Sequence, residues 1–158
     1  MSKNGKRKTM KIKFTVEGKP PKKDGSQSLW GEKSPYAPLV FQFRENAFEA
    51  KREAGMNNVF EGLVKIKISI FAPYLTIKDH HQHVGDLDNL VAGIFESMQP
   101  SSKNDTLKHH KIFDQNPDVE PSIPLLIADD SQIVTLSAKK IKSDKTFYEV
   151  EIEDINSS

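Results

Sequence analysis

Residues 63–71 read Leu-Val-Lys-Ile-Lys-Ile-Ser-Ile-Phe, and from the valine onward apolar and polar side chains alternate. Successive side chains of a strand point to opposite faces of a sheet, so this alternation predicts a strand with one buried and one exposed face. The buried face would carry Val64, Ile66, Ile68 and Ile70. Pro73 is expected to end the strand, because proline lacks the N–H group that pairs neighbouring strands.

The segments on either side of this strand predict two helices and three more strands. Residues 10–17 alternate in the same way, whereas apolar residues recur at helical spacing in residues 40–55 and 86–98. Two further segments rich in strand-forming residues close the chain, at about 132–141 and 146–152. This order predicts an α+β fold, an α/β layer sandwich in which two main helices cover a mixed β-sheet.

The chain length of 158 residues favours a single domain. We expect residues 1–9 to form a flexible basic tail and residues 10–158 to form that domain, with a long loop insertion at about 99–124. The absence of cysteine excludes disulfides and thiolate metal sites and is consistent with a cytoplasmic location. No apolar run approaches the roughly 20 residues that a membrane-spanning helix needs, so no membrane partner is expected.

Charge is distributed unevenly, although the net charge is only +1. Lysine and arginine dominate residues 1–23, and acidic residues dominate residues 149–154. A basic segment could neutralise DNA phosphates. A solubilising tail would have the same composition, so both interpretations of the N-terminal residues stay open.

Two short acidic motifs lie at the edges of apolar segments. Residues 85–90 read Gly-Asp-Leu-Asp-Asn-Leu, and residues 128–133 read Ala-Asp-Asp-Ser-Gln-Ile. Mg²⁺ takes oxygen ligands and usually only one or two carboxylates, together with water and phosphate. If the strand after the second motif lies near the start of the helix that carries the first, Asp86, Asp88 and Asp130 can converge on one ion. Such a site would indicate phosphodiester chemistry.

The same acids also have ordinary structural explanations. Asp86 stands at the expected helix start, where aspartate is a preferred cap, and an acid in the first turn complements the helix dipole. Asp129 and Asp130 precede a serine and a strand, which is typical turn chemistry. Glu96 would project from a neighbouring part of the same helix face. Spacing alone leaves the metal-binding and the structural interpretation open.

Four features in order along the chain resemble the RusA family of Holliday junction resolvases, which are crossover junction endodeoxyribonucleases. They are Gly-Lys-Pro-Pro-Lys-Lys at 18–23, the acidic motif at 86–90, the acidic motif at 129–133, and Lys140 in the strand that follows. The resemblance implies a RusA-like fold and a homodimeric, Mg²⁺-dependent endonuclease. Such an enzyme makes paired symmetric cuts in four-way DNA junctions during recombination and repair, and Mn²⁺ is expected to substitute for Mg²⁺.

The resemblance also implies roles for individual residues. Metal binding would fall to Asp86, Asp88 and Asp130, which are the expected catalytic residues together with Lys140. Asp129 and Glu96 would be secondary acidic residues. We expect contacts with DNA from five further residues, namely Lys19, Lys22, Lys23, Arg44 and Asn89.

One position departs from the family pattern. The metal motif of the family usually carries a lysine four residues after its second aspartate, and this chain has Ala92 there. Lys139 or Lys140 could substitute for that lysine if its side chain reaches the site. Three hypotheses follow: an active junction-cleaving nuclease, a catalytically weakened protein of the same fold that binds branched DNA, and a structural module whose acids are only caps and turns.

Overall fold

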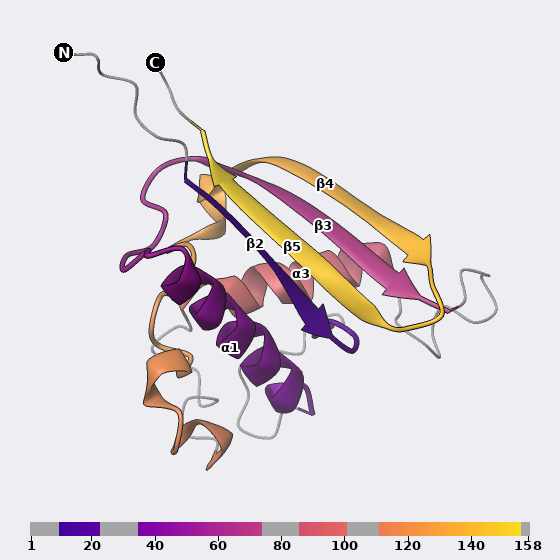
Figure 1. The fold of residues 1–158 in the computed structure, drawn as a ribbon, viewed down its shortest axis with the longest axis horizontal. Coiled ribbons are helices and arrows are strands. Elements are labelled where there is room, and N and C mark those ends of the chain that lie inside the picture. Colours follow the sequence, from indigo (N-terminus) through magenta and orange to yellow (C-terminus); the bar gives the residue numbers. More distant parts are fainter. Residues whose placement is uncertain (1–9, 23–34, 74–85, 101–110, 156–158) are drawn as a thin grey trace.

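The computed structural model describes residues 10–22, 35–73, 86–100 and 111–155. Four strands form one sheet in the order β2-β5-β3-β4, and both helices lie against one of its faces (Figure 1). Strands β3 and β4 are parallel, and the other neighbouring pairs are antiparallel. The strands are β2 (Lys11–Glu17), β3 (Val64–Ala72), β4 (Ile133–Lys142) and β5 (Phe147–Asp154), and the helices are α1 (Ala37–Glu53) and α3 (Leu87–Met98). This arrangement confirms the predicted α+β fold.

The side chains of the sheet divide into a buried face under the helices and an exposed face. In β3 the four predicted residues are buried, with Val64 and Ile70 fully so. On the exposed face, Lys65 lies opposite Glu153 of β5 and Lys67 opposite Glu151. The Lys65 ammonium is 3.1 Å from the Glu153 carboxylate. Acids and bases alternate across these strands, so the charges of the described residues on this face nearly balance.

Helix α1 begins and ends with local signals that the sequence contains. Proline occupies its first turn, where the missing N–H group costs nothing. Its last turn closes on Gly55, which has a φ of 71°. The N–H groups of Gly55 and Met56 donate to the carbonyls of Arg52 and Lys51 at 3.1 and 2.9 Å. This is a Schellman ending, and it satisfies the final carbonyls of the helix.

Helix α3 connects two parallel strands and therefore runs in the opposite direction to both. β3 ends at Ala72, α3 leads back from Leu87 to Met98, and β4 then repeats the direction of β3. The start of α3 therefore lies at the end of the sheet where the last residues of β3 and β4 are located. Its end, at Gln99, lies where those two strands begin. This orientation decides which predicted site residues can meet.

The described part of the 99–124 segment is irregular, as expected of a loop, but it is not confined to the surface. It contains two short 3-10 turns, Lys111–Phe113 and Pro117–Val119. Phe113 and Val119 are buried in the same core as the two helices. The Phe113 ring packs edge-to-face with Phe41 at a centroid distance of 5.9 Å. The insertion thus contributes to the core instead of looping over it.

Gly93 lets the segment before residue 23 pass directly over α3. A Cβ atom at this position would lie 1.9 Å from the backbone oxygen of Pro21. We therefore expect Gly93→Ala to lower the free energy of unfolding by about 1–3 kcal/mol, although alanine alone favours a helix by about 1 kcal/mol over glycine. Urea unfolding would measure this. Gly62→Ala is the matched control because a Cβ there meets nothing within 4 Å; an equal loss in both variants would contradict the steric explanation.

Candidate functional site

Asp86 and Asp88 present two exposed carboxylates at the start of α3. Asp86 is the N-terminal cap residue by position, but its side chain makes no capping hydrogen bond. Asp88 lies in the first turn, and within the described residues its carboxylate accepts the N–H group of the next residue, Asn89, at 2.9 Å. The Asp86 carboxylate therefore does not cap the helix. Both aspartates keep oxygens that can bind a cation.

Lys140 approaches these two aspartates from the end of β4. It lies opposite Ile70 on the buried face of the sheet, whereas Lys139 lies opposite Ser69 on the exposed face. Burial lowers the pKa of Lys140, and the charges of Asp86 and Asp88 oppose that shift. The electrostatic influence of both acids places the Lys140 side chain at the start of α3. Of the two lysines that could substitute for the one missing at position 92, the structure brings Lys140 to the acids.

Asp130 lies at the opposite end of the same helix. Its backbone N–H donates to the side-chain oxygen of Gln99, just beyond the end of α3, at 3.0 Å. Twelve helical residues separate that end from Asp86, and at 1.5 Å per residue this is a distance of about 18 Å. In the described residues, no group of three or more His, Asp or Glu side chains could hold one metal ion. The expected convergence of Asp86, Asp88 and Asp130 therefore does not occur within one chain.

The reason for this separation is the direction of the chain. The expectation required the start of β4 to lie near the start of α3. A helix that joins two parallel strands runs back along them, so the start of the second strand meets the end of the helix. The acidic motif at 128–133 precedes β4 and is therefore placed at Gln99. The order strand, helix, strand could be recognised in the sequence. The parallel pairing of β3 with β4, which fixes the direction of α3, could not.

Asp129 has a structural function in the described fold. Its carboxylate accepts the N–H group of Ser131 at 3.0 Å, and the hydrogen bonds from Ser131 lower the pKa of Asp129. Gln132 completes a capping box around the turn Asp130–Gln132. The Gln132 amide also donates to the carbonyls of Phe60 and Gly62, at 2.6 and 2.9 Å. These bonds fix the turn that presents Asp130, whose own side chain is exposed.

Arg44 is fully buried, although it was expected to contact DNA. Its guanidinium donates to backbone carbonyls at the end of α3 and in the following segment: Ser97 and Val119 at 2.8 Å, Glu120 at 3.0 Å, and Ile123. Burial lowers the pKa of Arg44 to about 10, against the opposing charge of Glu120. Arg44 therefore joins α1 to α3 and the insertion and is inaccessible to DNA in this fold.

The remaining predicted residues lie at scattered positions. Glu96 and Asn89 are half-buried on α3. Lys19 is exposed after β2, and Lys22 is half-buried in the segment that crosses Gly93. Lys23 lies outside the described residues.

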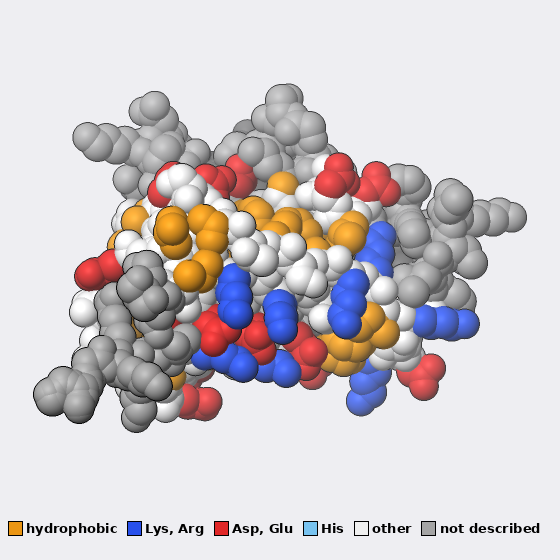
Figure 2. Space-filling model, turned by 90° about the horizontal axis from the view of Figure 1, so that it is seen from above, with side chains coloured by type: hydrophobic (Ala, Val, Ile, Leu, Met, Phe, Trp, Pro, Cys, Tyr) orange, Lys and Arg blue, Asp and Glu red, His pale blue; other side chains and the backbone are white. Residues whose placement is uncertain are grey.

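An apolar groove beside the aspartates was not anticipated from the sequence. It has a volume of ≈ 600 Å³ and lies between α3 and β4, which forms the edge of the sheet. Val134 and Leu136 of β4 are 50% and 43% exposed. Apolar side chains gather on the surface seen from the β4 side (Figure 2). The groove is lined by Leu87, Asp88, Val91, Ala92, Phe95, Leu136 and Ala138.

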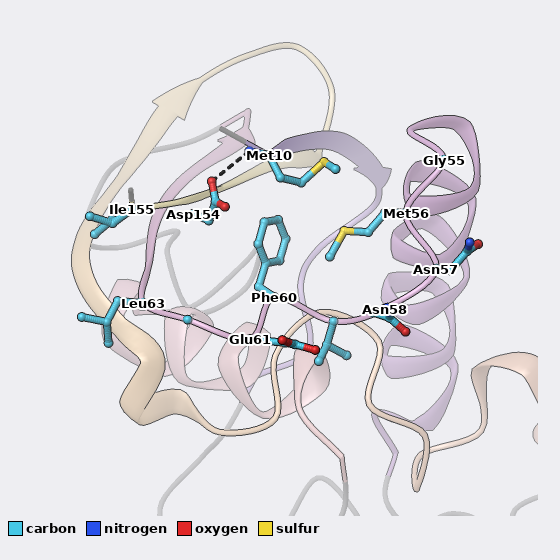
Figure 3. Close-up of a pocket in the computed structure, with 12 residues that line it drawn as sticks. Met10, Gly55, Met56, Asn57, Asn58, Phe60, Glu61, Leu63, Asp154 and Ile155 are labelled. Atoms are coloured by element: carbon cyan, nitrogen blue, oxygen red, sulfur yellow. Dashed lines mark hydrogen bonds between the residues drawn. The ribbon is translucent and has the colours of Figure 1, made fainter. Parts of the chain in front are cut away.

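A second hollow lies elsewhere, between the start of β2 and the loop before β3 (Figure 3). It has a volume of ≈ 650 Å³, and Phe60, Met10 and Met56 point toward one another in it. The Asp154 carboxylate in its wall accepts the N–H group of Met10 at 2.8 Å. Asp86, Asp88 and Asp130 do not line this hollow.

No protein-family model matches the chain, and no curated protein matches it. Among the described helices, none has the length and apolar character needed to cross a membrane.

Proposed function

We propose that this chain is a Mg²⁺-dependent endonuclease that, as a homodimer, resolves four-way DNA junctions by paired phosphodiester cleavage in recombination and repair. The observation that carries the proposal is the pair of exposed carboxylates, Asp86 and Asp88, beside the half-buried Lys140. These groups combine oxygen ligands for a hard cation with a fixed positive charge. The proposed substrate, a four-way DNA junction, is inferred from the resemblance of the surrounding motifs to the RusA family.

The donor set suits Mg²⁺ because carboxylates are the ligands it prefers, and one or two of them are usual. When bound, Mg²⁺ supplies a Lewis acid for the scissile phosphate and lowers the pKa of a coordinated water. Asp86 and Asp88 would hold and orient the ion at the start of α3. Lys140 would keep its proton on Nζ and offset the negative charge that grows on the phosphate during attack.

A second copy of the chain would complete this site. β4 has a strand partner on only one side in the described fold, and its exposed apolar residues suit a self-complementary interface. A two-fold axis that passes through the α3–β4 groove at right angles to α3 would place the two copies of α3 antiparallel, with the start of one beside the end of the other. It would bring Asp130 of the partner subunit to Asp86 and Asp88. The homodimer would thereby assemble the three acids that one chain keeps apart, and its symmetry would match paired cuts in a four-way junction.

One observation favours a weaker function for the same fold. Ala92 lines the groove beside Asp88, at the position where the RusA family usually carries a lysine. Without a compensating group the chain would bind branched DNA and cut it slowly or not at all. The position of Lys140 is the reason for preferring the active nuclease.

Cleavage of an end-labelled four-way junction in Mg²⁺ tests the proposal, with linear duplex as the control substrate. We expect paired nicks on opposite strands with the wild-type chain and none with Asp88→Asn. Circular dichroism would check that the variant is folded. Junction binding without nicks would favour the weakened binding protein, and absence of both binding and cleavage would leave Asp86 and Asp88 as residues of an ordinary helix start.

The two neighbouring lysines of β4 offer a matched comparison. Lys140→Met is expected to lower the cleavage rate by about 10²–10³-fold, the usual cost of losing one group that stabilises transition-state charge. Lys139→Met should cut at the wild-type rate, because residue 139 faces the other side of the sheet. Single-turnover rates in saturating Mg²⁺ would measure both. If Ala92→Lys restored the rate of Lys140→Met, the two lysines would share one role; equal rates for the two methionine variants would contradict the assignment.

A further inference from the structure

Lys51 of α1 is a largely buried lysine, but its ammonium is not among the fully enclosed polar atoms of the described residues. The residue is 7% exposed, and in the part of the chain that the structure describes its ammonium makes no hydrogen bond or ion pair. Burial lowers the pKa of Lys51, and the nearby positive charge of Arg44 lowers it further. An ammonium partly removed from water beside a second cation is stabilised when an anion binds it.

The fold does not use this ammonium for an evident structural purpose. Lysines in a last turn often donate to the final carbonyls of a helix. Here the Lys51 carbonyl already accepts the Met56 N–H group, and the Arg52 carbonyl accepts that of Gly55. Glu120 is the acid whose charge acts on Arg44, and its carboxylate accepts the Ser122 N–H group at 3.0 Å.

Lys51 lines a pocket between the end of α1 and the end of the insertion. The pocket has a volume of ≈ 410 Å³, within the usual range for small-molecule sites. One wall is apolar, with Phe48, Ile123 and Leu125. The lining carries two cationic side chains, Lys51 and Arg52, and one acid, the exposed Asp118; Arg52 is paired with Glu49 of the same helix. The pocket therefore combines the Lys51 ammonium with an apolar surface against which a flat ring can pack.

We propose that this pocket binds a nucleotide through its 5′-phosphate, with the phosphate on the Lys51 ammonium and the base against Phe48 and the apolar wall. An ammonium is a compact charge suited to a phosphate oxygen, and an aromatic side chain accepts any base by stacking. The ligand is either a free mononucleotide or the 5′-terminal nucleotide of a DNA strand. The inference does not rest on the nuclease activity, since none of its residues belongs to the Asp86 site.

Isothermal titration of dAMP into the full chain tests the assignment. The wild-type chain should bind dAMP saturably and more tightly than inorganic phosphate. Lys51→Met should weaken that binding about tenfold or more, because a charge-assisted contact is lost. Lys145→Met is the control, since Lys145 is exposed in the turn before β5. Methionine matches the lysine stem, so thermal unfolding should show a folded variant; Lys51→Gln provides a second substitution.

Two oligonucleotides distinguish the sources of the ligand. Tighter binding of a 5′-phosphorylated single strand than of its 5′-hydroxyl counterpart, abolished in Lys51→Met, would indicate a strand end. Equal binding of the two strands alongside Lys51-dependent binding of dAMP would indicate a free mononucleotide. Failure of the wild-type chain to bind dAMP, equal affinity for dAMP and inorganic phosphate, or unchanged binding in both Lys51 variants would overturn the proposal.

Discussion

Arg44→Met is expected to lower the free energy of unfolding by about 3–5 kcal/mol, the usual cost of removing one partner from a buried charged network. The guanidinium is fully buried and donates to four backbone carbonyls on α3 and the insertion. Methionine fills part of the volume but donates nothing, so these carbonyls would be left without their hydrogen bonds. The insertion would lose its main polar attachment to α1.

Urea unfolding followed by circular dichroism would measure this change. Arg52→Met is the matched control, because Arg52 is exposed on the same helix and pairs with Glu49 at 2.9 Å. Its loss should cost less than about 1 kcal/mol, as is usual for surface ion pairs. If Arg44→Met were as stable as Arg52→Met but bound DNA more weakly, Arg44 would be a DNA contact and not a structural residue.

Mixing two inactive variants should restore cleavage if the metal site spans two chains. Asp88→Asn and Asp130→Asn are each expected to abolish cutting. In a mixed dimer, one site combines both substitutions, while the other combines the intact Asp88 of one chain with the intact Asp130 of its partner. Random exchange makes about half of the dimers mixed, and each mixed dimer has one intact site of two. About a quarter of all sites in the mixture would therefore be intact. Such dimers should nick one strand and leave the junction unresolved.

The pattern of recovery separates the possible arrangements. If all three acids acted within one chain, a mixed dimer would contain no intact site, and no nicks would appear. Mixing Asp86→Asn with Asp88→Asn is the matched control, because both substitutions fall at the start of α3 and every site would then carry one of them. Recovery in that control would refute the two-chain arrangement, and so would a wild-type chain that remains monomeric in sedimentation while cutting at full rate.

The predicted strands and helices depended on local patterns, and the local patterns were reliable. The strand at 63–71 is observed as Val64–Ala72, and the helix at 86–98 as Leu87–Met98. The helix expected at 40–55 begins earlier, at Ala37, because a proline in the first turn favours its start. The resemblance also showed that Ala92 replaces a usual lysine and that Lys139 or Lys140 could substitute for it. Only the register of β4 against β3 shows that Lys140, and not Lys139, lies on the side of the acids.

Residue type misled the assignment of Arg44 and did not show that Asp129 and Asp130 have different roles in the turn. An arginine on a helix with polar neighbours resembles a surface residue, and burial emerges only when the insertion covers it. Asp129 and Asp130 are adjacent and chemically identical, but the turn Asp130–Gln132 uses the first as a cap and leaves the second exposed. Lys51 was similarly indistinguishable from a surface lysine until its pocket was known.

The amino-acid sequence by itself determined the secondary structure, the α+β class and the acidic motifs, because alternation, helical spacing and turn residues act over a few neighbouring positions. Only the tertiary structure decided where those motifs meet. The parallel pairing of β3 with β4 reverses α3 between them and places Asp130 and Asp86 at opposite ends of this helix, which is about 18 Å long. That pairing depends on contacts between residues far apart in the chain, which no local pattern specifies.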